Sequence, residues 1–204
     1  MKSSDKLMDP IASDRSEARP AVSGDEEAAL LARVAAGDIQ AFELLYRGYY
    51  RRLTRFLERL TRHPHIVDDV LDETMMVVWR KAATFNGTSR TSTWIFAIAY
   101  NKAMKALRHR GDSMQTLLED ETEGASDGPE TELIKLQSSL GVRRLIARLS
   151  PEQRAVVELT YYYGYAYKEI AEIVGCPVDT VKTRMFHARR KLRAMLMALG
   201  QKSS

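Results

Sequence analysis

Apolar residues recur at steps of three and four positions along most of the chain after residue 24. This spacing puts them on one side of an α-helix, so it predicts amphipathic helices that bury one face. Runs of β-branched residues are scarce, which favours helices over sheets. The pattern predicts an all-α fold with two small helical domains, joined by an acidic flexible linker, of which the C-terminal one is a helix-turn-helix.

The first domain is expected to span residues 25–111. A short helix over 25–36 precedes a long amphipathic helix, and Pro64 breaks the chain after it, because proline cannot continue a helix. The apolar positions of the long helix are Phe42, Leu45, Tyr49, Leu53, Phe56 and Leu60.

A third helix is predicted over 66–84, a loop over 85–92, and a fourth helix from there to about residue 108. The apolar side of the third helix consists of Val67, Leu71, Thr74, Met75 and Val78. The loop is rich in Asn, Gly, Ser and Thr, which favour turns. Thr91, Ser92 or Thr93 is expected to cap the fourth helix.

Two polar segments flank this domain. Residues 1–24 are expected to form a disordered tail. Residues 112–132 carry eight Asp or Glu and no Lys or Arg, and like charges keep such a segment extended. The second segment is therefore predicted to be an interdomain linker.

The second domain is expected to span 133–199, with helices over 151–162, 167–174 and 178–199. Ser150 and Pro151 suit the N-cap and the first position of one of them.

The segment Tyr167–Val181 has the features of a helix-turn-helix. A short helix ends at Gly175, which can adopt the left-handed conformation of a sharp helix end, and a second helix begins three residues later. Ala171 is small where the two helices cross, and Ile170, Val174 and Val181 supply the apolar contact. We predict a DNA-binding unit rather than a plain helical hairpin.

The second helix of this unit separates an apolar stripe from a polar, basic face. The stripe consists of Val181, Met185, Ala188, Leu192 and Leu199. A helix in the major groove needs polar groups for base edges and cations for phosphates. The candidate DNA-binding residues are Lys168, Lys182, Thr183, Arg184, Phe186, His187, Arg189 and Arg190, with Thr183, His187 and Arg190 expected near bases and Lys182, Arg184 and Arg189 near phosphates.

The charge distribution agrees with a polyanionic partner. The net charge is +4, and residues 178–199 contain six Lys or Arg but one acid, Asp179. A solvated surface helix is the alternative explanation.

Composition also limits the chemistry. The single cysteine, Cys176, excludes an internal disulfide and a Cys-based zinc site, and no Walker-type loop or nucleophile–base pair is found. An enzyme, a cofactor and a metal site are therefore not expected. The chain lacks a signal-peptide pattern and a stretch long enough to span a membrane, so a cytoplasmic protein is predicted.

Two further groups of residues are suited to binding a macromolecule, one a basic partner and the other a nucleic-acid strand. Four carboxylates line the polar side of the third helix, and without a local cation they repel one another unless a basic partner meets them. The next helix combines aromatic and basic residues, which suit a single nucleic-acid strand. The candidates are Asp68, Asp69, Asp72, Glu73 and Met76 on the acidic helix, and Asn86, Arg90, Asn101, Lys102, Lys105 and Arg108 on the loop and basic helix.

Several segments resemble the sigma-70 family of bacterial RNA polymerase sigma factors, in its extracytoplasmic-function (ECF) group. Residues 67–82 resemble the core-binding region and 93–102 the promoter-melting region. The family's second DNA-binding domain has similar segments, which here are residues 149–154, 180–184 and 188–192.

The resemblance covers 25–111 and 133–196 and implies a transcription initiation factor. Its partners would be core RNA polymerase, bound by the acidic helix, promoter DNA, and an anti-sigma factor. The first domain would open the minus-10 element and the second would read minus-35. One departure is Asp72, where the family commonly has Gln. A stand-alone helix-turn-helix regulator is the alternative, but it does not explain the acidic helix and the basic helix of the first domain.

Overall fold

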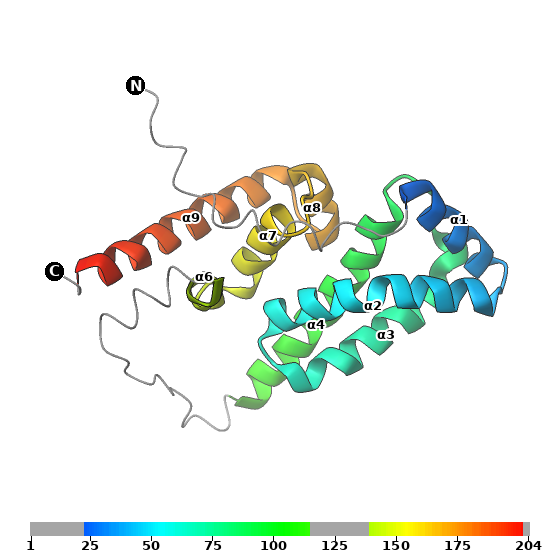
Figure 1. Ribbon diagram of the computed structural model, residues 1–204, viewed down its shortest axis with the longest axis horizontal. Helices are drawn as coiled ribbons and strands as arrows, with labels where there is room; N and C mark the ends of the chain where they lie inside the picture. The colour runs from blue at the N-terminus through cyan, green and yellow to red at the C-terminus, as the bar shows by residue number, and fades with distance from the viewer. Residues whose placement is uncertain (1–22, 115–138, 202–204) are drawn as a thin grey trace.

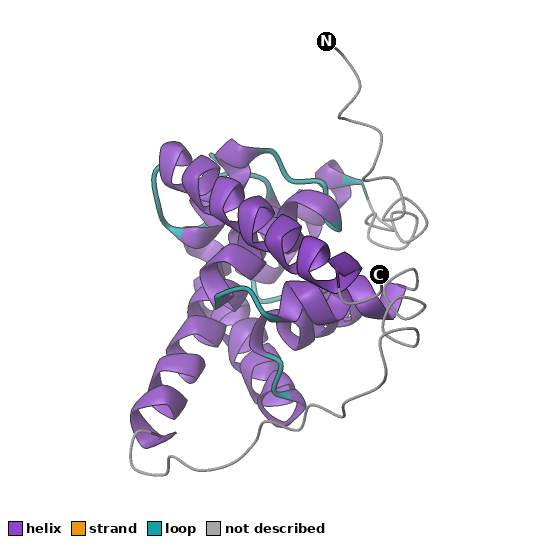
Figure 2. Ribbon diagram, turned by 90° about the vertical axis from the view of Figure 1, so that its left-hand side faces the viewer, coloured by secondary structure: helices purple, strands orange, loops and turns teal. Residues whose placement is uncertain are grey.

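The computed structural model describes residues 23–114 and 139–201, and every regular element in those ranges is helical (Figures 1 and 2). The first unit contains α1 (Gly24–Ala35), α2 (Ile39–Thr61), α3 (Val67–Lys81) and α4 (Thr91–Met114), with short 3-10 turns η2 (Pro64–Ile66) and η3 (Ala82–Thr84) at the two ends of α3. The second unit contains α6 (Ser139–Ala147), α7 (Pro151–Tyr161), α8 (Tyr167–Val174) and α9 (Val178–Gln201). The predicted all-α fold is confirmed. The predicted tail up to residue 22, the linker from 115 onward and residues 133–138 lie outside the described residues.

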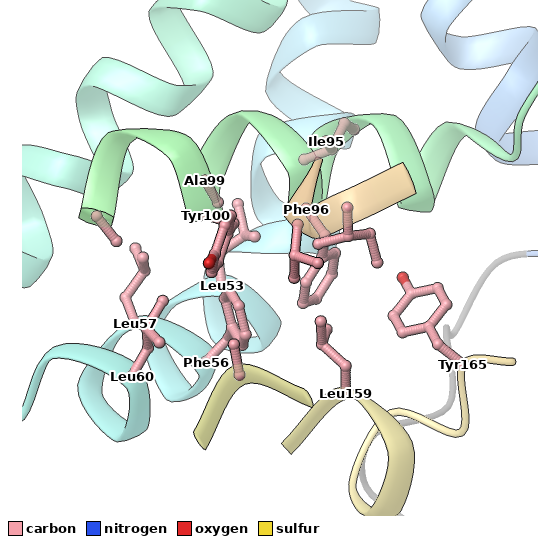
Figure 3. Close-up of a cluster of buried hydrophobic side chains, with 14 of the residues drawn as sticks. Leu53, Phe56, Leu57, Leu60, Ile95, Phe96, Ala99, Tyr100, Leu159 and Tyr165 are labelled. Atoms are coloured by element: carbon pink, nitrogen blue, oxygen red, sulfur yellow. The ribbon is translucent and has the colours of Figure 1, made fainter. Parts of the chain in front are cut away.

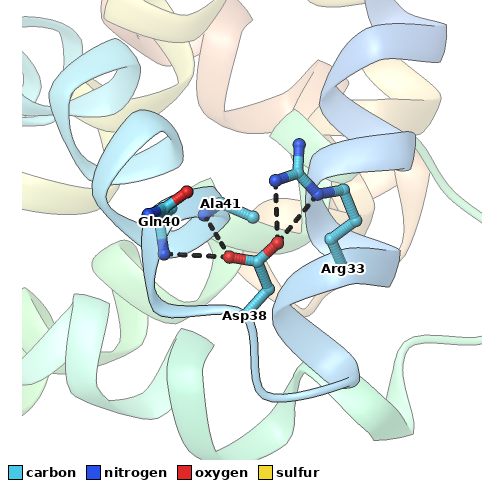
Figure 4. A network of polar contacts seen from close by, with 4 residues as sticks. All are labelled: Arg33, Asp38, Gln40 and Ala41. Atoms are coloured by element: carbon cyan, nitrogen blue, oxygen red, sulfur yellow. Dashed lines mark hydrogen bonds and ion pairs between the residues drawn. The ribbon is translucent and has the colours of Figure 1, made fainter.

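Local capping signals fix several helix starts. The Ser150 hydroxyl accepts from the Gln153 N–H at 3.3 Å, and Pro151 occupies the first turn, as predicted. Asp38 caps α2 by accepting from the N–H groups of Gln40 and Ala41, and its other oxygen accepts from Arg33 at 2.7 Å (Figure 4). These hydrogen bonds, chiefly that from Ala41, lower the pKa of the Asp38 carboxyl.

Three predicted boundaries differ from the structure. Ser23 is the N-cap of α1, so this helix begins inside the expected tail. Helix α4 begins at Thr91, so none of the three expected hydroxyl residues is its N-cap. The same helix continues to Met114 and takes in the start of the expected linker. Gly111 does not end it, because one glycine inside a helix costs only about 1 kcal/mol relative to alanine.

The apolar periodicity correctly identified the buried faces of the first unit. Within α2, five of the six predicted residues are fully buried and Phe42 is partly buried against Trp79. All five predicted residues of α3 are buried. Glu27 of α1 is also buried, where it accepts from the Tyr49 hydroxyl at 2.6 Å and pairs with Arg52 at 2.9 Å. This contact ties α1 to α2.

The two units pack against each other and share one apolar core. Helix α8 lies on α4, and α7 lies on α2. Phe56 and Phe96 of the first unit and Leu159 of the second are all fully buried in the cluster of Figure 3. The ring of Tyr163 contacts both phenylalanines, with a centroid distance of 5.0 Å to Phe96. The sequence pattern did not predict this contact between units.

Polar contacts cross the same boundary, which we call the seam. Arg154 donates to the carbonyl of Leu60 at 2.6 Å and to those of Ala147 and Leu149, so it joins the C-terminal end of α2 to the second unit. Burial lowers the pKa of Arg154 to about 10. Glu158 of α7 pairs with Arg59 of α2 at 3.2 Å.

Glu158 gives a testable pH dependence. Its side chain is 3% exposed, and burial raises its pKa from 4.5 to about 7 despite the attraction of Arg59. The folded chain therefore holds this proton more tightly than the unfolded chain, and stability falls as pH rises from about 4.5 to 7. At roughly 1.4 kcal/mol per pKa unit, the loss is about 3 kcal/mol. Glu158→Gln should flatten this slope in urea unfolding measured from pH 5 to 8. The exposed Glu172→Gln should keep it, and an unchanged slope in Glu158→Gln would contradict the assignment.

Replacing two of the glycines by alanine should change the free energy of unfolding in opposite directions. Gly175 caps α8 with φ of 65°, a left-handed conformation that costs other residues about 1–2 kcal/mol. Gly48 lies within α2, and a Cβ there would meet nothing within 4 Å. Gly175→Ala should therefore lower the free energy of unfolding by about 1 kcal/mol, whereas Gly48→Ala should raise it by about 0.5–1 kcal/mol. Thermal unfolding of both variants checks the signs.

Candidate nucleic-acid interface

The helix-turn-helix has the predicted geometry. Gly175 ends α8, and the Cys176 N–H donates to the Ala171 carbonyl at 3.1 Å. Ile170 and Val181 are fully buried between the two helices. The stripe of α9 continues through buried Met185 and Ala188 to partly buried Leu192, while Leu199 lies outside the described side chains.

The opposite side of α9 forms the reading face, which consists of Lys168 on α8 and of Lys182, Thr183, Arg184, Phe186, His187, Arg189 and Arg190. Most of these side chains are exposed, and Arg184 and His187 are half-buried. Phe186 is 62% exposed, although it is a large apolar residue. Its ring contacts His187 at 5.5 Å, and the Arg190 guanidinium lies 5.9 Å from its centroid. The face thus offers cations, polar groups and one apolar ring, the types that base edges and phosphates require.

Several of these side chains have partners within the chain. Lys182 pairs with Asp179 at 2.9 Å, and the Thr183 hydroxyl donates to the Asp179 carbonyl. Arg189 donates to the Tyr161 hydroxyl at 2.9 Å. The first pair is exposed and exchanges readily for phosphate contacts.

The predicted single-strand residues form two groups. Asn86 and Arg90 lie before α4, where the Asn86 side chain accepts from Thr88. Asn101, Lys105 and Arg108 are exposed along the C-terminal half of α4. At 1.5 Å per residue, Arg90 is roughly 17–27 Å from these three residues along the helix axis. Trp94 is half-buried against the apolar core, with its ring 5.4 Å from that of Phe85.

Lys102 links the basic helix to the acidic one. Its ammonium group lies 2.8 Å from Glu73 of α3. The hydrogen bond from Lys102 lowers the pKa of the Glu73 carboxyl. The expectation that the four carboxylates have no local cation is therefore wrong for Glu73, because α3 packs against α4 and residues 29 positions apart become neighbours.

The remaining carboxylates form the acidic face, which consists of Asp68, Asp69 and Asp72 together with exposed Met76. An aromatic row on α2 lies beside it and was not predicted. The Tyr46 hydroxyl donates to Asp72 at 2.9 Å, and the ring of Tyr46 stacks on Tyr50 at 6.0 Å. Burial and the Asp72 carboxylate raise the pKa of Tyr46 to about 12. The spacing of Phe42, Tyr46 and Tyr50 at steps of four could have identified this row.

Within the described residues, no group of three or more His, Cys, Asp or Glu could hold a metal ion. No helix in the same part of the chain is long and apolar enough to cross a membrane.

These features define a helical protein with one unit that contains a helix-turn-helix and another that presents an acidic face and a basic helix. Comparison with known families gives two matches: sigma-70 region 2 over residues 45–112 and sigma-70 region 4 over residues 139–192. The chain belongs to the sigma-70 family, and its relatives place it in the ECF group.

The relatives are similar over most of their length. The chain is 30% identical to RNA polymerase sigma-H factor of Pseudomonas aeruginosa, with 86% of this chain and 96% of the relative covered. It is 32% identical to the ECF RNA polymerase sigma factor SigM of Mycobacterium tuberculosis, with 83% and 84% covered. Among solved structures, CnrH in complex with the cytosolic domain of CnrY is 26% identical, with a TM-score of 0.62 and coverage of 85% of this chain and 99% of that one.

Proposed function

We propose that this protein is a transcription initiation factor that binds core RNA polymerase and directs it to specific promoters. The region-2 unit, residues 25–111, would bind core polymerase and open the minus-10 element. The region-4 unit, residues 133–199, would read the minus-35 element. The observation that carries the proposal is the presence of all three surfaces in one chain, in the order of the family regions. The protein acts without catalysing a reaction, in the cytoplasm where polymerase and promoters meet.

The acidic face is the proposed docking surface for core polymerase. Asp68, Asp69 and Asp72 are exposed side by side with Met76, and the Tyr46–Tyr50 row extends the surface with aromatic carbon. Acidic groups around an apolar centre suit a partner helix with basic and apolar side chains. Glu73 takes a different role, since it faces Lys102 and joins this surface to the DNA-binding helix.

The loop and basic helix are the proposed surface for the minus-10 element. Asn86 and Arg90 flank the loop, and Asn101, Lys102, Lys105 and Arg108 follow along α4. Cations along α4 suit the phosphates of an unpaired strand, although Tyr100 is 5% exposed and offers no free ring for stacking. A base flipped from the duplex would be held by this loop.

The reading face of α9 is the proposed surface for the minus-35 element, and Phe186 offers a specific test. An exposed ring on such a helix suits the methyl group of thymine. Replacing the thymines of the element by deoxyuridine should weaken wild-type binding several-fold and leave Phe186→Ala almost unaffected. Equal losses for both proteins in a competition binding assay would exclude this contact.

Co-elution with sigma-free core polymerase on size exclusion, followed by promoter-specific transcription, tests the proposal. Both should be observed at micromolar protein. Tight binding to a palindromic duplex without polymerase, and no co-elution, would instead favour the stand-alone regulator. An anti-sigma factor is the expected regulatory partner of such a protein.

A further inference from the structure

The boundary between α2 and α3 carries a row of aromatic rings that runs beside the acidic face. The two helices lie side by side (Figure 1), and the rings of Phe42 and Trp79 contact each other across them with a centroid distance of 5.1 Å. Along α2, Tyr46 lies between Phe42 at 6.3 Å and Tyr50 at 6.0 Å. Ring contacts at such distances are attractive and depend on orientation. The ring of Tyr46 is therefore fixed by a neighbour on each side.

The Tyr46 hydroxyl joins this row to the acidic face. It donates to Asp72 Oδ1 at 2.9 Å, from α2 to α3. Burial and the Asp72 carboxylate raise the pKa of Tyr46 to about 12, so the hydroxyl keeps its proton at neutral pH. Asp72 thus has a hydrogen-bond donor beside it whose position is set by a fixed ring.

This hydrogen bond orients a carboxylate that would otherwise rotate in solvent. Asp72 is exposed on α3, and ordering a side chain when a complex forms costs conformational entropy. The contact with Tyr46 uses one carboxylate oxygen, and a carboxylate has a second oxygen that can accept from a binding partner. A partner that meets Asp72 therefore meets an acceptor that is already oriented, and the entropy cost of binding is smaller.

The same contact is less important for holding the two helices together. Residues of both helices, such as Leu45 and Leu71, are buried in the apolar core and supply the packing between them. The Tyr46–Asp72 hydrogen bond lies at the exposed edge of this packing. There it replaces hydrogen bonds to water, so its net contribution to stability is small.

Position 72 is also where the chain departs from the family, which commonly has Gln there. A Gln side chain offers both a donor and an acceptor, whereas an ionised Asp side chain only accepts. The Tyr46 hydroxyl supplies one donor to Asp72 from within the chain. The partner group that meets the other oxygen must then also be a donor, such as the cationic end of Arg or Lys.

We propose that Tyr46 is a positioning residue for polymerase docking, which orients Asp72 so that its carboxylate accepts from a cationic group of core polymerase. This inference rests on the proposed function. Tyr46 acts through Asp72 in this role, so the effect of removing the Tyr46 hydroxyl must disappear when Asp72 is replaced.

A double-mutant cycle measured by binding kinetics tests this. The wild type, Tyr46→Phe, Asp72→Ala and the double variant are each captured on a sensor surface and exposed to sigma-free core polymerase. Tyr50→Phe is the matched control, since it removes the hydroxyl of the next ring in the row and leaves the hydrogen bond to Asp72 in place. Thermal unfolding of each variant checks that it is folded.

We expect Tyr46→Phe to dissociate from core polymerase about fivefold faster and to associate at the wild-type rate, because it loses a short-range contact but keeps the charge that steers association. Adding Tyr46→Phe to Asp72→Ala should leave both rates of that variant unchanged. Tyr50→Phe should behave as the wild type. A variant that was merely less stable would give fewer active molecules, without faster dissociation of those that bind.

Dissociation of Tyr46→Phe at the wild-type rate would overturn the proposal, as would an equal acceleration in the presence and absence of Asp72. An equal effect of Tyr50→Phe would also overturn it, because the cause would then be the aromatic row and not the hydrogen bond to Asp72. Failure of the proposed function would be seen separately, as absence of binding by the wild type.

Discussion

The double variant Asp69→Lys/Asp72→Lys is expected to weaken binding to core RNA polymerase by at least about 100-fold, or about 3 kcal/mol. Both carboxylates are exposed on α3, so their replacement leaves the core of the first unit intact. Reversing them opposes a basic partner with like charge, and such contacts cost several kcal/mol. The measurement is a titration of labelled protein with core polymerase at low and at physiological salt.

The controls separate the position of the charge from its amount. Glu58→Lys/Glu172→Lys makes the same change in net charge at exposed positions on α2 and α8 that are not part of the acidic face, and it should bind core polymerase as the wild type does. Asp72→Gln introduces the residue that is common in the family at this position and should cost little. If the control double variant loses binding equally, the effect is one of net charge, and the acidic face is not the docking surface.

Features decided by local sequence were predictable. The start of α7 follows from Ser150 and Pro151, and the end of α8 follows from Gly175, because each signal acts within one helical turn. The apolar faces of α2, α3 and α9 follow from the helical period in the same way.

Features decided by contacts between distant residues were not predictable. Glu73 was predicted to belong to the acidic face, but α3 packs on α4, and Glu73 therefore forms an ion pair with Lys102. The seam depends on Phe56 and Phe96 meeting Tyr163, and the helical period reports only that such rings are buried, without naming what covers them. A segment read as a linker between domains further suggested independent units, whereas the described parts share one core.

The burial of the predicted DNA-binding residues decides how each of them can be tested. Because Arg184 is half-buried and its guanidinium lies 3.8 Å from Cys176 Sγ, its replacement disturbs packing within the second unit as well as the predicted DNA surface. Lys182 and Arg189 have exposed side chains, and among the described residues their partners Asp179 and Tyr161 belong to the same unit. These two cations therefore report on DNA binding without disturbing the seam.

The variant Lys182→Ala/Arg189→Ala is expected to weaken promoter binding by the polymerase complex about 10- to 100-fold, equally for preferred and altered minus-35 sequences. Each phosphate contact contributes about 0.9 to the slope of log K against log salt, so the slope should become shallower by nearly 2. His187→Ala/Arg190→Ala, by contrast, should reduce discrimination between minus-35 sequences, because base contacts carry specificity.

Arg193→Ala is the matched control, since it removes an exposed cation from α9 beyond the reading face. Since Arg193 is assigned no phosphate contact, its removal should leave both the affinity and the salt slope at their wild-type values. Competition binding at several salt concentrations separates the outcomes. If Lys182→Ala/Arg189→Ala leaves the salt slope unchanged while discrimination falls, these side chains read bases, and the division of the reading face into phosphate and base contacts must be reversed.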